Sequence, residues 1–173
     1  MNLPGHVVLV GLPGAGKTTV GQALAARLGL PFIDFDLEIA RRAGQTIPDI
    51  FATRGEPWFR ALEAELTREV AAAPPAVVAP GGGWAAQPGL VALLRPPAAL
   101  IHLRVSPATA VARMHHSLSE RPLLAGSDPE ARAVTLWEMR REAYAQADFE
   151  IDTEVIGVQE VVERALQLIS RSE

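Results

Sequence analysis

The chain has 173 residues, of which 49% are hydrophobic and 21% charged, and its formal net charge is −4. This length fits one domain with one core, and the acidic balance excludes a basic surface for nonspecific nucleic-acid binding. The absence of cysteine excludes disulfides, thiolate zinc sites and a cysteine nucleophile. The sequence also has no signal-peptide pattern and no apolar run near the roughly 20 residues that span a bilayer. We therefore expect one cytoplasmic domain over residues 1–173 that binds neither nucleic acid nor a membrane.

The first predicted elements are a strand, a glycine-rich loop and a helix. Residues 7–10 form a β-branched apolar run, and residues 19–28 carry apolar side chains at helical spacing. Between them, residues 11–18 read GLPGAGKT and match the phosphate-binding pattern G-x-x-x-x-G-K-[ST]. The glycines let backbone N–H groups surround phosphate oxygens, Lys17 would reach the β- and γ-phosphates, and Thr18 would ligate Mg²⁺. Lys17 is also the only lysine in the chain. These features predict a nucleoside triphosphate site.

The rest of the chain alternates apolar strands with amphipathic helices, which predicts an α/β fold with a parallel sheet covered on both faces. Gly29 and Gly44 are expected to end helices, and Thr46 and Ser106 to begin them. Segment 115–128 shows no periodicity and is interpreted as mobile. We expect strands at 30–33, 76–79, 100–103 and 149–152, and helices at 37–43, 46–51, 58–73, 90–94, 107–114, 129–147 and 158–169.

Two carboxylates follow the second predicted strand, at the edge of the sheet where open α/β proteins bind their ligands. We expect Asp34 to contribute to magnesium binding, with Asp152 as a rival that more naturally falls in a loop beside the nucleotide base. Asp36 could accept a proton from an attacking hydroxyl. Alternatively, Asp36 is only the N-cap of helix 37–43.

Two further motifs come from the middle of the chain. Arg60 and Glu63 lie three residues apart and share a helical face, which a surface ion pair of little energetic value would also explain. Three consecutive glycines, residues 81–83, follow the predicted strand 76–79 directly. They suit a close approach of backbone to a ligand, although a flexible turn is an equally good interpretation.

Arginines in the second half of the chain are candidates for anion binding. Arg121 falls inside segment 115–128, and an arginine on a closing loop can stabilise a transferring phosphoryl group while water is excluded. Arg140 and Arg141 lie on the following helix. One of them could clamp an anionic substrate group bidentately, or both could face solvent.

Together these motifs resemble the shikimate kinase family over nearly the whole chain. The phosphate-binding loop alone is shared by many unrelated NTPases, but its combination with the other motifs in this order is far more specific. The motifs that carry the resemblance are residues 11–18, Asp34-Phe35-Asp36, Ile47 with Phe51, Gly55-Glu56, Phe59-Arg60 with Glu63, Gly81-Gly82-Gly83, Arg121-Pro122-Leu123-Leu124, and Arg140 with Tyr144.

The resemblance implies a fold and an activity. The fold is a P-loop kinase with three α/β/α layers and a five-stranded parallel sheet in the order 2-3-1-4-5. It carries a lid at about residues 115–128 and acceptor-binding helices at about residues 36–73. The activity is transfer of a phosphoryl group from ATP to the 3-hydroxyl of shikimate, a step of chorismate and aromatic amino-acid biosynthesis. We expect a monomer that uses Mg²⁺ and has no macromolecular partner.

The resemblance also implies a role for each motif residue. Asp36 is the proposed base, and Lys17 and Arg121 complete the catalytic set. Thr18 and Asp34 are the implied magnesium residues. The implied nucleotide-binding residues are Gly14, Ala15, Gly16, Lys17, Thr18, Thr19, Arg113 and Arg121. The implied shikimate-binding residues are Asp36, Arg60, Gly81, Gly82, Gly83 and Arg140.

The sequence departs from the family pattern in three places. Trp84 follows the glycines where the family usually has a small or aliphatic residue, so its indole could reshape the acceptor pocket. Spacing alone favours Arg140 over Arg141 as the carboxylate ligand, and Met114 is an alternative to Arg113 beside adenine. Two other functions were weighed: a kinase for another polyol acid such as gluconate, and a non-catalytic nucleotide-binding module.

Overall fold

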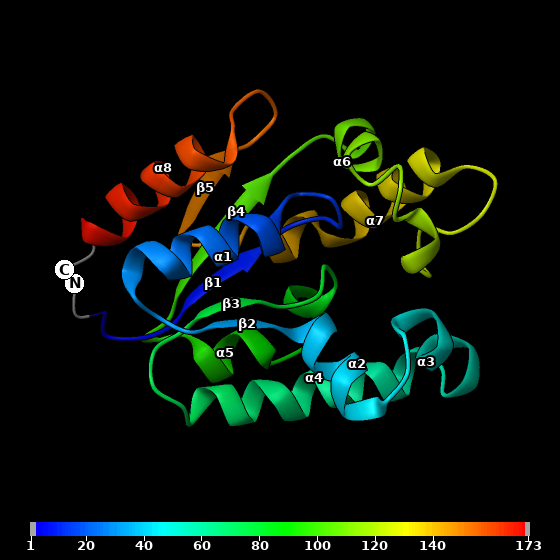
Figure 1. The fold of residues 1–173 in the computed structure, drawn as a ribbon, viewed down its shortest axis with the longest axis horizontal. Coiled ribbons are helices and arrows are strands. Elements are labelled where there is room, and N and C mark those ends of the chain that lie inside the picture. Colours follow the sequence, from blue (N-terminus) through cyan, green and yellow to red (C-terminus); the bar gives the residue numbers. More distant parts are fainter. Residues whose placement is uncertain (1–2, 172–173) are drawn as a thin grey trace.

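Five parallel strands form the centre of the computed structural model, which describes residues 3–171 (Figure 1). Their order across the sheet is β2-β3-β1-β4-β5, as the resemblance implied. The three-layer α/β architecture predicted from the sequence is thereby confirmed. The strands are β1 (Val7–Val10), β2 (Phe32–Asp34), β3 (Val77–Ala79), β4 (Ala99–Arg104) and β5 (Phe149–Asp152).

The central strand explains why its sequence is continuously apolar. Every residue of β1 is buried, because β3 and β4 flank it and helices cover both faces of the sheet. In the register of the sheet, Val8 lies between Val78 and Leu100. All strands run in one direction, so their carboxyl ends meet at one edge, and the loops that follow them gather there (Figure 1).

The helices form the outer layers of the fold. Helices α1 (Lys17–Leu28) and α8 (Val158–Ser170) pack together on one side of the sheet, and α4 (Glu56–Ala71) packs against α5 (Leu90–Leu94) on the other (Figure 1). The carboxyl edge carries the remaining short elements and the start of α7. The remaining elements are α2 (Phe35–Ala43), α3 (Ile47–Thr53), α6 (Pro107–Arg113), α7 (Pro129–Tyr144) and the 3₁₀ turns η1 (Trp84–Ala86) and η2 (Leu118–Glu120).

The predicted helix boundaries are confirmed where a cap sets them. Gly29 and Gly44 adopt the left-handed conformation, with φ of 66° and 63°, at the ends of α1 and α2. The side chains of Thr46 and Ser106 accept hydrogen bonds from backbone N–H groups in the first turns of α3 and α6. Boundaries without such a signal shift by a few residues.

One predicted cap is wrong. Asp34, not Asp36, is the N-cap of α2, and its Oδ1 accepts a hydrogen bond of 3.2 Å from the backbone N–H of Leu37. The helix therefore begins two residues earlier than the apolar pattern indicates. Asp36 lies in the first turn of the helix, where its carboxylate is not needed for capping. Segment 115–128, predicted without regular structure, contains η2.

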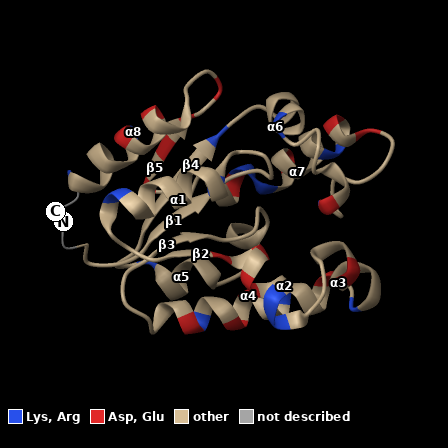
Figure 2. Ribbon diagram, in the orientation of Figure 1, with Lys and Arg blue, Asp and Glu red and all other residues tan. Residues whose placement is uncertain are grey.

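Charges of both signs are interspersed over the helices in the view of Figure 2, in keeping with the small net charge of the chain. Within residues 3–171, no helix is both long and apolar enough to cross a membrane.

Candidate active site

The phosphate-binding loop lies between β1 and α1 and needs its glycines for steric reasons. Gly14 has a φ of 85°, and a Cβ there would lie 2.3 Å from the carbonyl oxygen of Ala110. The Lys17 Nζ donates hydrogen bonds to the carbonyl oxygens of Gly11 and Leu12, at 2.8 and 2.9 Å. Burial lowers the pKa of Lys17 to about 7, and Arg121 also lowers it. A bound phosphate would favour the charged ammonium again.

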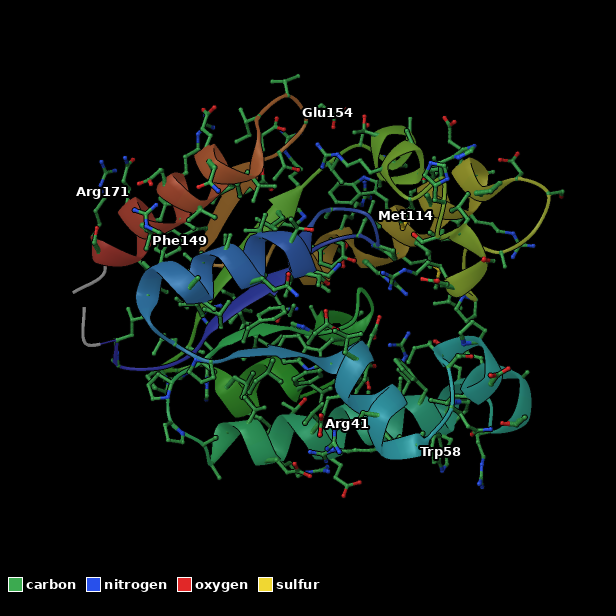
Figure 3. All side chains as sticks on the ribbon, in the orientation of Figure 1. Arg41, Trp58, Met114, Phe149, Glu154 and Arg171 are labelled. Carbon is green, nitrogen blue, oxygen red and sulfur yellow. The ribbon has the colours of Figure 1, made fainter. Side chains whose placement is uncertain are left out.

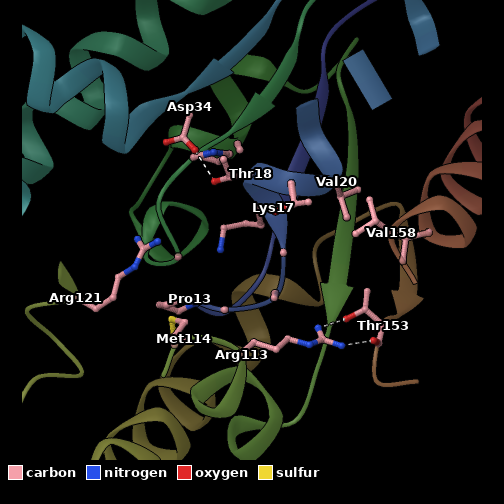
Figure 4. A pocket seen from close by; sticks show the side chains of 18 of the residues that line it. Pro13, Lys17, Thr18, Val20, Asp34, Arg113, Met114, Arg121, Thr153 and Val158 are labelled. Atoms are coloured by element: carbon pink, nitrogen blue, oxygen red, sulfur yellow. Dashed lines mark hydrogen bonds between the residues drawn. The ribbon is translucent and has the colours of Figure 1, made fainter. Parts of the chain in front are cut away.

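Thr18 and Asp34 lie beside each other although they are 16 positions apart. The Thr18 hydroxyl donates a hydrogen bond of 2.6 Å to Asp34 Oδ2, drawn as a dashed line in Figure 4. The end of β2 thus brings a carboxylate to the first turn of α1. Mg²⁺ is commonly held by one or two protein oxygens together with phosphates and water, and this pair of oxygens fits that chemistry.

A pocket at the carboxyl edge of the sheet contains every nucleotide and magnesium residue predicted above (Figure 4). Arg113 donates hydrogen bonds to the carbonyl oxygen and hydroxyl of Thr153, at 2.5 and 3.2 Å, and is held against the loop after β5. Met114, the alternative to Arg113, also lines this pocket. Asp152 ends β5, does not line this pocket and forms an ion pair with Arg104. Thr153, the next residue, does line the pocket, so the expected loop beside the nucleotide begins directly after Asp152.

Arg121 joins this pocket to a second one. Its Nη1 donates a hydrogen bond of 3.0 Å to Asp36 Oδ2, and Arg121 lines both pockets. Burial raises the pKa of Asp36, whereas the positive charge of Arg121 lowers it. The predicted base and the predicted lid arginine therefore share one ion pair, next to the phosphate-binding loop.

The second pocket brings together all residues predicted to bind the acceptor. They reach it from α2, α4, α7 and the turn after β3, and apolar side chains complete the wall. The predicted residues that line this pocket are Asp36, Arg60, Gly81, Gly82, Gly83 and Arg140.

The interpretation of Arg60 and Glu63 as a surface ion pair is wrong. Glu63 is completely buried, and its Oε2 accepts hydrogen bonds of 2.6 Å from both Arg60 Nη1 and Gln87 Nε2. Burial raises the pKa of Glu63, and the adjacent Arg60 guanidinium opposes that effect. A buried carboxylate of this kind fixes the orientation of the arginine, because moving the guanidinium away would leave a buried charge unpaired.

Arg140 and Arg141 have different environments. Arg140 is 6% exposed and lines the acceptor pocket, whereas Arg141 is exposed on α7. Within residues 3–171, no salt bridge to a carboxylate involves Arg140. A Cβ on Gly83 would lie 2.6 Å from Arg60 Nη2 and 3.0 Å from Arg140 Nη2. The glycines therefore make room for two guanidinium groups, and a flexible turn does not explain them.

Trp84 does not line the acceptor pocket. Its side chain is completely buried beneath the turn, and its Nε1 donates a hydrogen bond of 2.9 Å to Thr67 Oγ1. Trp84 lines neither of the two pockets. The expectation that the indole narrows the acceptor site is thus wrong, and this departure from the family pattern is a difference in the core.

Comparison with known proteins shows the family to which the chain belongs. The sequence profile of the shikimate kinase family matches residues 13–170. The shikimate kinase of Symbiobacterium thermophilum is 42% identical over 164 residues, which is 94% of each chain. That of Moorella thermoacetica is 43% identical over 152 residues, covering 88% of this chain and 87% of the relative. This chain belongs to the shikimate kinase family.

Solved structures extend the match to three dimensions. The shikimate kinase from Acinetobacter baumannii in complex with shikimate superposes with a TM-score of 0.93 at 34% identity, over 98% of this chain and 94% of the other. A gluconokinase from Sinorhizobium meliloti has a TM-score of 0.64 at 23% identity, over 99% of this chain and 94% of the other. The likeness to the gluconokinase concerns the fold alone.

Some residues of this shikimate kinase family site were not predicted. Gln87 binds Glu63, and Ile156, Val158 and Val161 form an apolar wall of the nucleotide pocket. The apolar positions fit a helix that packs on the sheet equally well, so the pattern could not distinguish a core position from a pocket wall. Gln87 has no local signal, because its partner is 24 residues away.

Proposed function

We propose that this protein transfers the γ-phosphoryl group of ATP to the 3-hydroxyl of shikimate, giving shikimate 3-phosphate and ADP, in aromatic amino-acid biosynthesis. The observation that carries the proposal is the second pocket. It places one carboxylate, Asp36, in the same pocket as the partly buried Arg60 and the buried Arg140, next to the phosphate-binding loop. A polyol acid needs these groups: a base for the hydroxyl and cations for the carboxylate.

On the nucleotide side, loop N–H groups and Lys17 hold the phosphates, and Arg113 lies against the base. Mg²⁺ would be held by Thr18, with Asp34 acting on it through the hydrogen bond between them or through water. A bound Mg²⁺ would neutralise phosphate charge during the transfer. Thr18 and Asp34 would set the position of the metal ion beside the phosphate-binding loop.

On the acceptor side, Arg60 and Arg140 bind the carboxylate, and the backbone of residues 81–83 contacts the ring hydroxyls. Asp36 accepts the proton of the attacking 3-hydroxyl. Burial raises its pKa and thereby makes it a stronger base. Arg121 binds Oδ2 of Asp36, so Oδ1 can accept the proton of the hydroxyl while the guanidinium stays close to the transferring phosphoryl group.

The segment 115–128 acts as a lid in this proposal, because Arg121 belongs to it and contacts both pockets. Closure over both substrates excludes water that would otherwise hydrolyse ATP. Both pockets are lined by one chain, so we also propose a monomer acting in the cytoplasm, where ATP is available. Light scattering during gel filtration tests the oligomeric state.

The test is ADP release with Mg·ATP and shikimate, with gluconate and no acceptor as parallel reactions. Release that depends on shikimate, together with a product phosphorylated at the 3-hydroxyl, is the expected result. Release with another acceptor only would retain the phosphate chemistry and refute the substrate. ATP binding without release to any acceptor would refute the kinase and favour a nucleotide-binding module.

A further inference from the structure

Two buried aromatic residues hold the turn 81–83 from opposite sides. The Tyr144 hydroxyl donates a hydrogen bond of 2.6 Å to the carbonyl oxygen of Gly82. Trp84, the next residue after the turn, donates from Nε1 to Thr67 Oγ1. Both rings are almost completely buried, and neither lines the acceptor pocket. Their polar groups therefore act on the protein around the pocket and do not touch a ligand.

On the α4 side, the Trp84 contact reaches the helical turn that holds Arg60. Thr67 donates a hydrogen bond of 2.6 Å to the carbonyl oxygen of Glu63, one helical turn earlier, and Glu63 in turn binds Arg60. Gln87, three residues after Trp84, provides a second link through its hydrogen bond to Glu63. The segment after the glycines is thus attached twice to the part of α4 that orients Arg60.

On the α7 side, Tyr144 lies one helical turn after Arg140. Its ring stacks on His102 of β4, with centroids 5.0 Å apart and planes inclined by 24°. The Nδ1 of His102 lies 3.0 Å from Glu150 Oε2 on the neighbouring strand. The Tyr144 hydroxyl is therefore supported from the sheet and fixes Gly82 relative to the helix that carries Arg140.

We propose that Trp84 and Tyr144 are positioning residues that set the separation and orientation of Arg60 and Arg140 for a carboxylate of the acceptor. Both guanidinium groups meet at Gly83, and two arginines share a carboxylate well only when both keep a narrow range of geometry. The aromatic contacts join α4 and α7 through the turn between them. This inference rests on the proposed function, because it concerns the same acceptor site.

The experiment compares kinetic constants after isosteric removal of each hydrogen bond. Tyr144→Phe and Thr67→Val should each raise the shikimate KM about fivefold, because the net free energy of one buried hydrogen bond corresponds to a change in affinity of this size. We expect the ATP KM and kcat to stay within about twofold. Thr67→Ser keeps the hydroxyl and should restore the shikimate KM. Trp84→Phe should behave as Thr67→Val does.

Trp58→Phe is the matched control, because Trp58 is a partly buried indole on α4 (Figure 3) that forms no part of the acceptor pocket. It should leave all constants unchanged. Equal increases in the KM of shikimate and ATP, an unchanged shikimate KM, or loss of folding in Thr67→Val as well as Trp84→Phe would overturn the positioning role. Wild-type activity toward shikimate is measured in the same series, so failure of the proposed function itself is recognised separately.

Discussion

The nucleotide site and the acceptor site lie side by side but are built in different ways. The phosphate-binding part of the nucleotide site comes from one continuous segment, residues 11–19, whose geometry depends on backbone N–H groups and glycines. The acceptor site takes side chains from helices α2, α3, α4 and α7 and from segment 115–128, and backbone from the glycine turn. Ion pairs and close packing hold these groups together. A local site tolerates changes elsewhere in the fold, whereas an assembled site depends on every element that contributes to it.

Asp36→Asn should have the largest effect, and it should reduce turnover without weakening ATP binding. The amide keeps the size of the side chain but cannot accept the proton of the attacking hydroxyl, so kcat should fall by about 10²- to 10⁴-fold. ATP affinity should change little, because the phosphate-binding loop is intact. Turnover is measured with saturating substrates and ATP binding by titration calorimetry. Turnover near the wild-type level would show that Asp36 is not the base.

Arg60→Ala should have the next largest effect and should be confined to the acceptor. Removing a partly buried cation that faces an anionic substrate should lower kcat/KM for shikimate about 100-fold, mainly through KM, with the ATP KM retained. The variant should also be less stable by about 3 kcal/mol, because Glu63 loses its charged partner.

The two consequences of Arg60→Ala can be separated. Adding Glu63→Gln should recover stability without recovering shikimate affinity, since the buried negative charge is gone while the cation is still missing. Arg41→Ala serves as the control, because Arg41 is exposed and, among residues 3–171, its ion pair is with its helix neighbour Glu38. Equal increases in both KM values for Arg60→Ala would contradict the assignment of Arg60 to the acceptor.

Gly82→Ala tests the place where the two sites touch. A Cβ at this position would lie 2.9 Å from Pro13 Cδ and 3.1 Å from Arg140 Nη1, so it would displace both the phosphate-binding loop and an acceptor arginine. We expect the KM of each substrate to rise about tenfold. Gly81→Ala is the matched variant, because the atoms nearest to its Cβ would belong to Glu63 and Asp36 on the acceptor side, and it should leave the ATP KM unchanged. An identical pattern in both variants would contradict this division.

The same difference decided what the sequence could reveal. The phosphate-binding loop is fixed by covalent spacing, so the strand, loop and helix around it were predicted from the residues alone. The acceptor residues were predicted to form one site only from the resemblance to a family, because no local pattern shows that Arg60 and Arg140 lie in the same pocket. The spacing of Arg60 and Glu63 is the same in a buried and in an exposed pair, and burial was therefore missed. For Trp84, the sequence showed an unusual residue but not the direction of its side chain.

A final comparison is between this catalytic edge and the opposite edge of the sheet, where His6 links the start of β1 to β3. His6 Nδ1 accepts a hydrogen bond of 3.1 Å from the backbone N–H of Ala76, which only an unprotonated Nδ1 can do. Burial lowers the pKa of His6 below its ordinary 6.5. The unfolded chain therefore binds a proton at a higher pH than the folded chain, so the free energy of unfolding decreases as the pH falls below that ordinary value.

His6→Asn should remove part of this pH dependence, because an asparagine oxygen can accept the same hydrogen bond but does not titrate. The measurement is the urea midpoint at about pH 7.5 and about pH 5, where we expect the variant to lose less stability than the wild type. His102 is also buried and has a lowered pKa. It therefore contributes to the loss of stability at low pH in the variant and in the wild type alike. His115→Gln, at an exposed position, should retain the wild-type difference. An equal decrease of the urea midpoint in His6→Asn and wild type would exclude His6 as a source of the pH dependence. Unchanged kinetic constants in His6→Asn would show that stability at this edge is independent of both substrate sites.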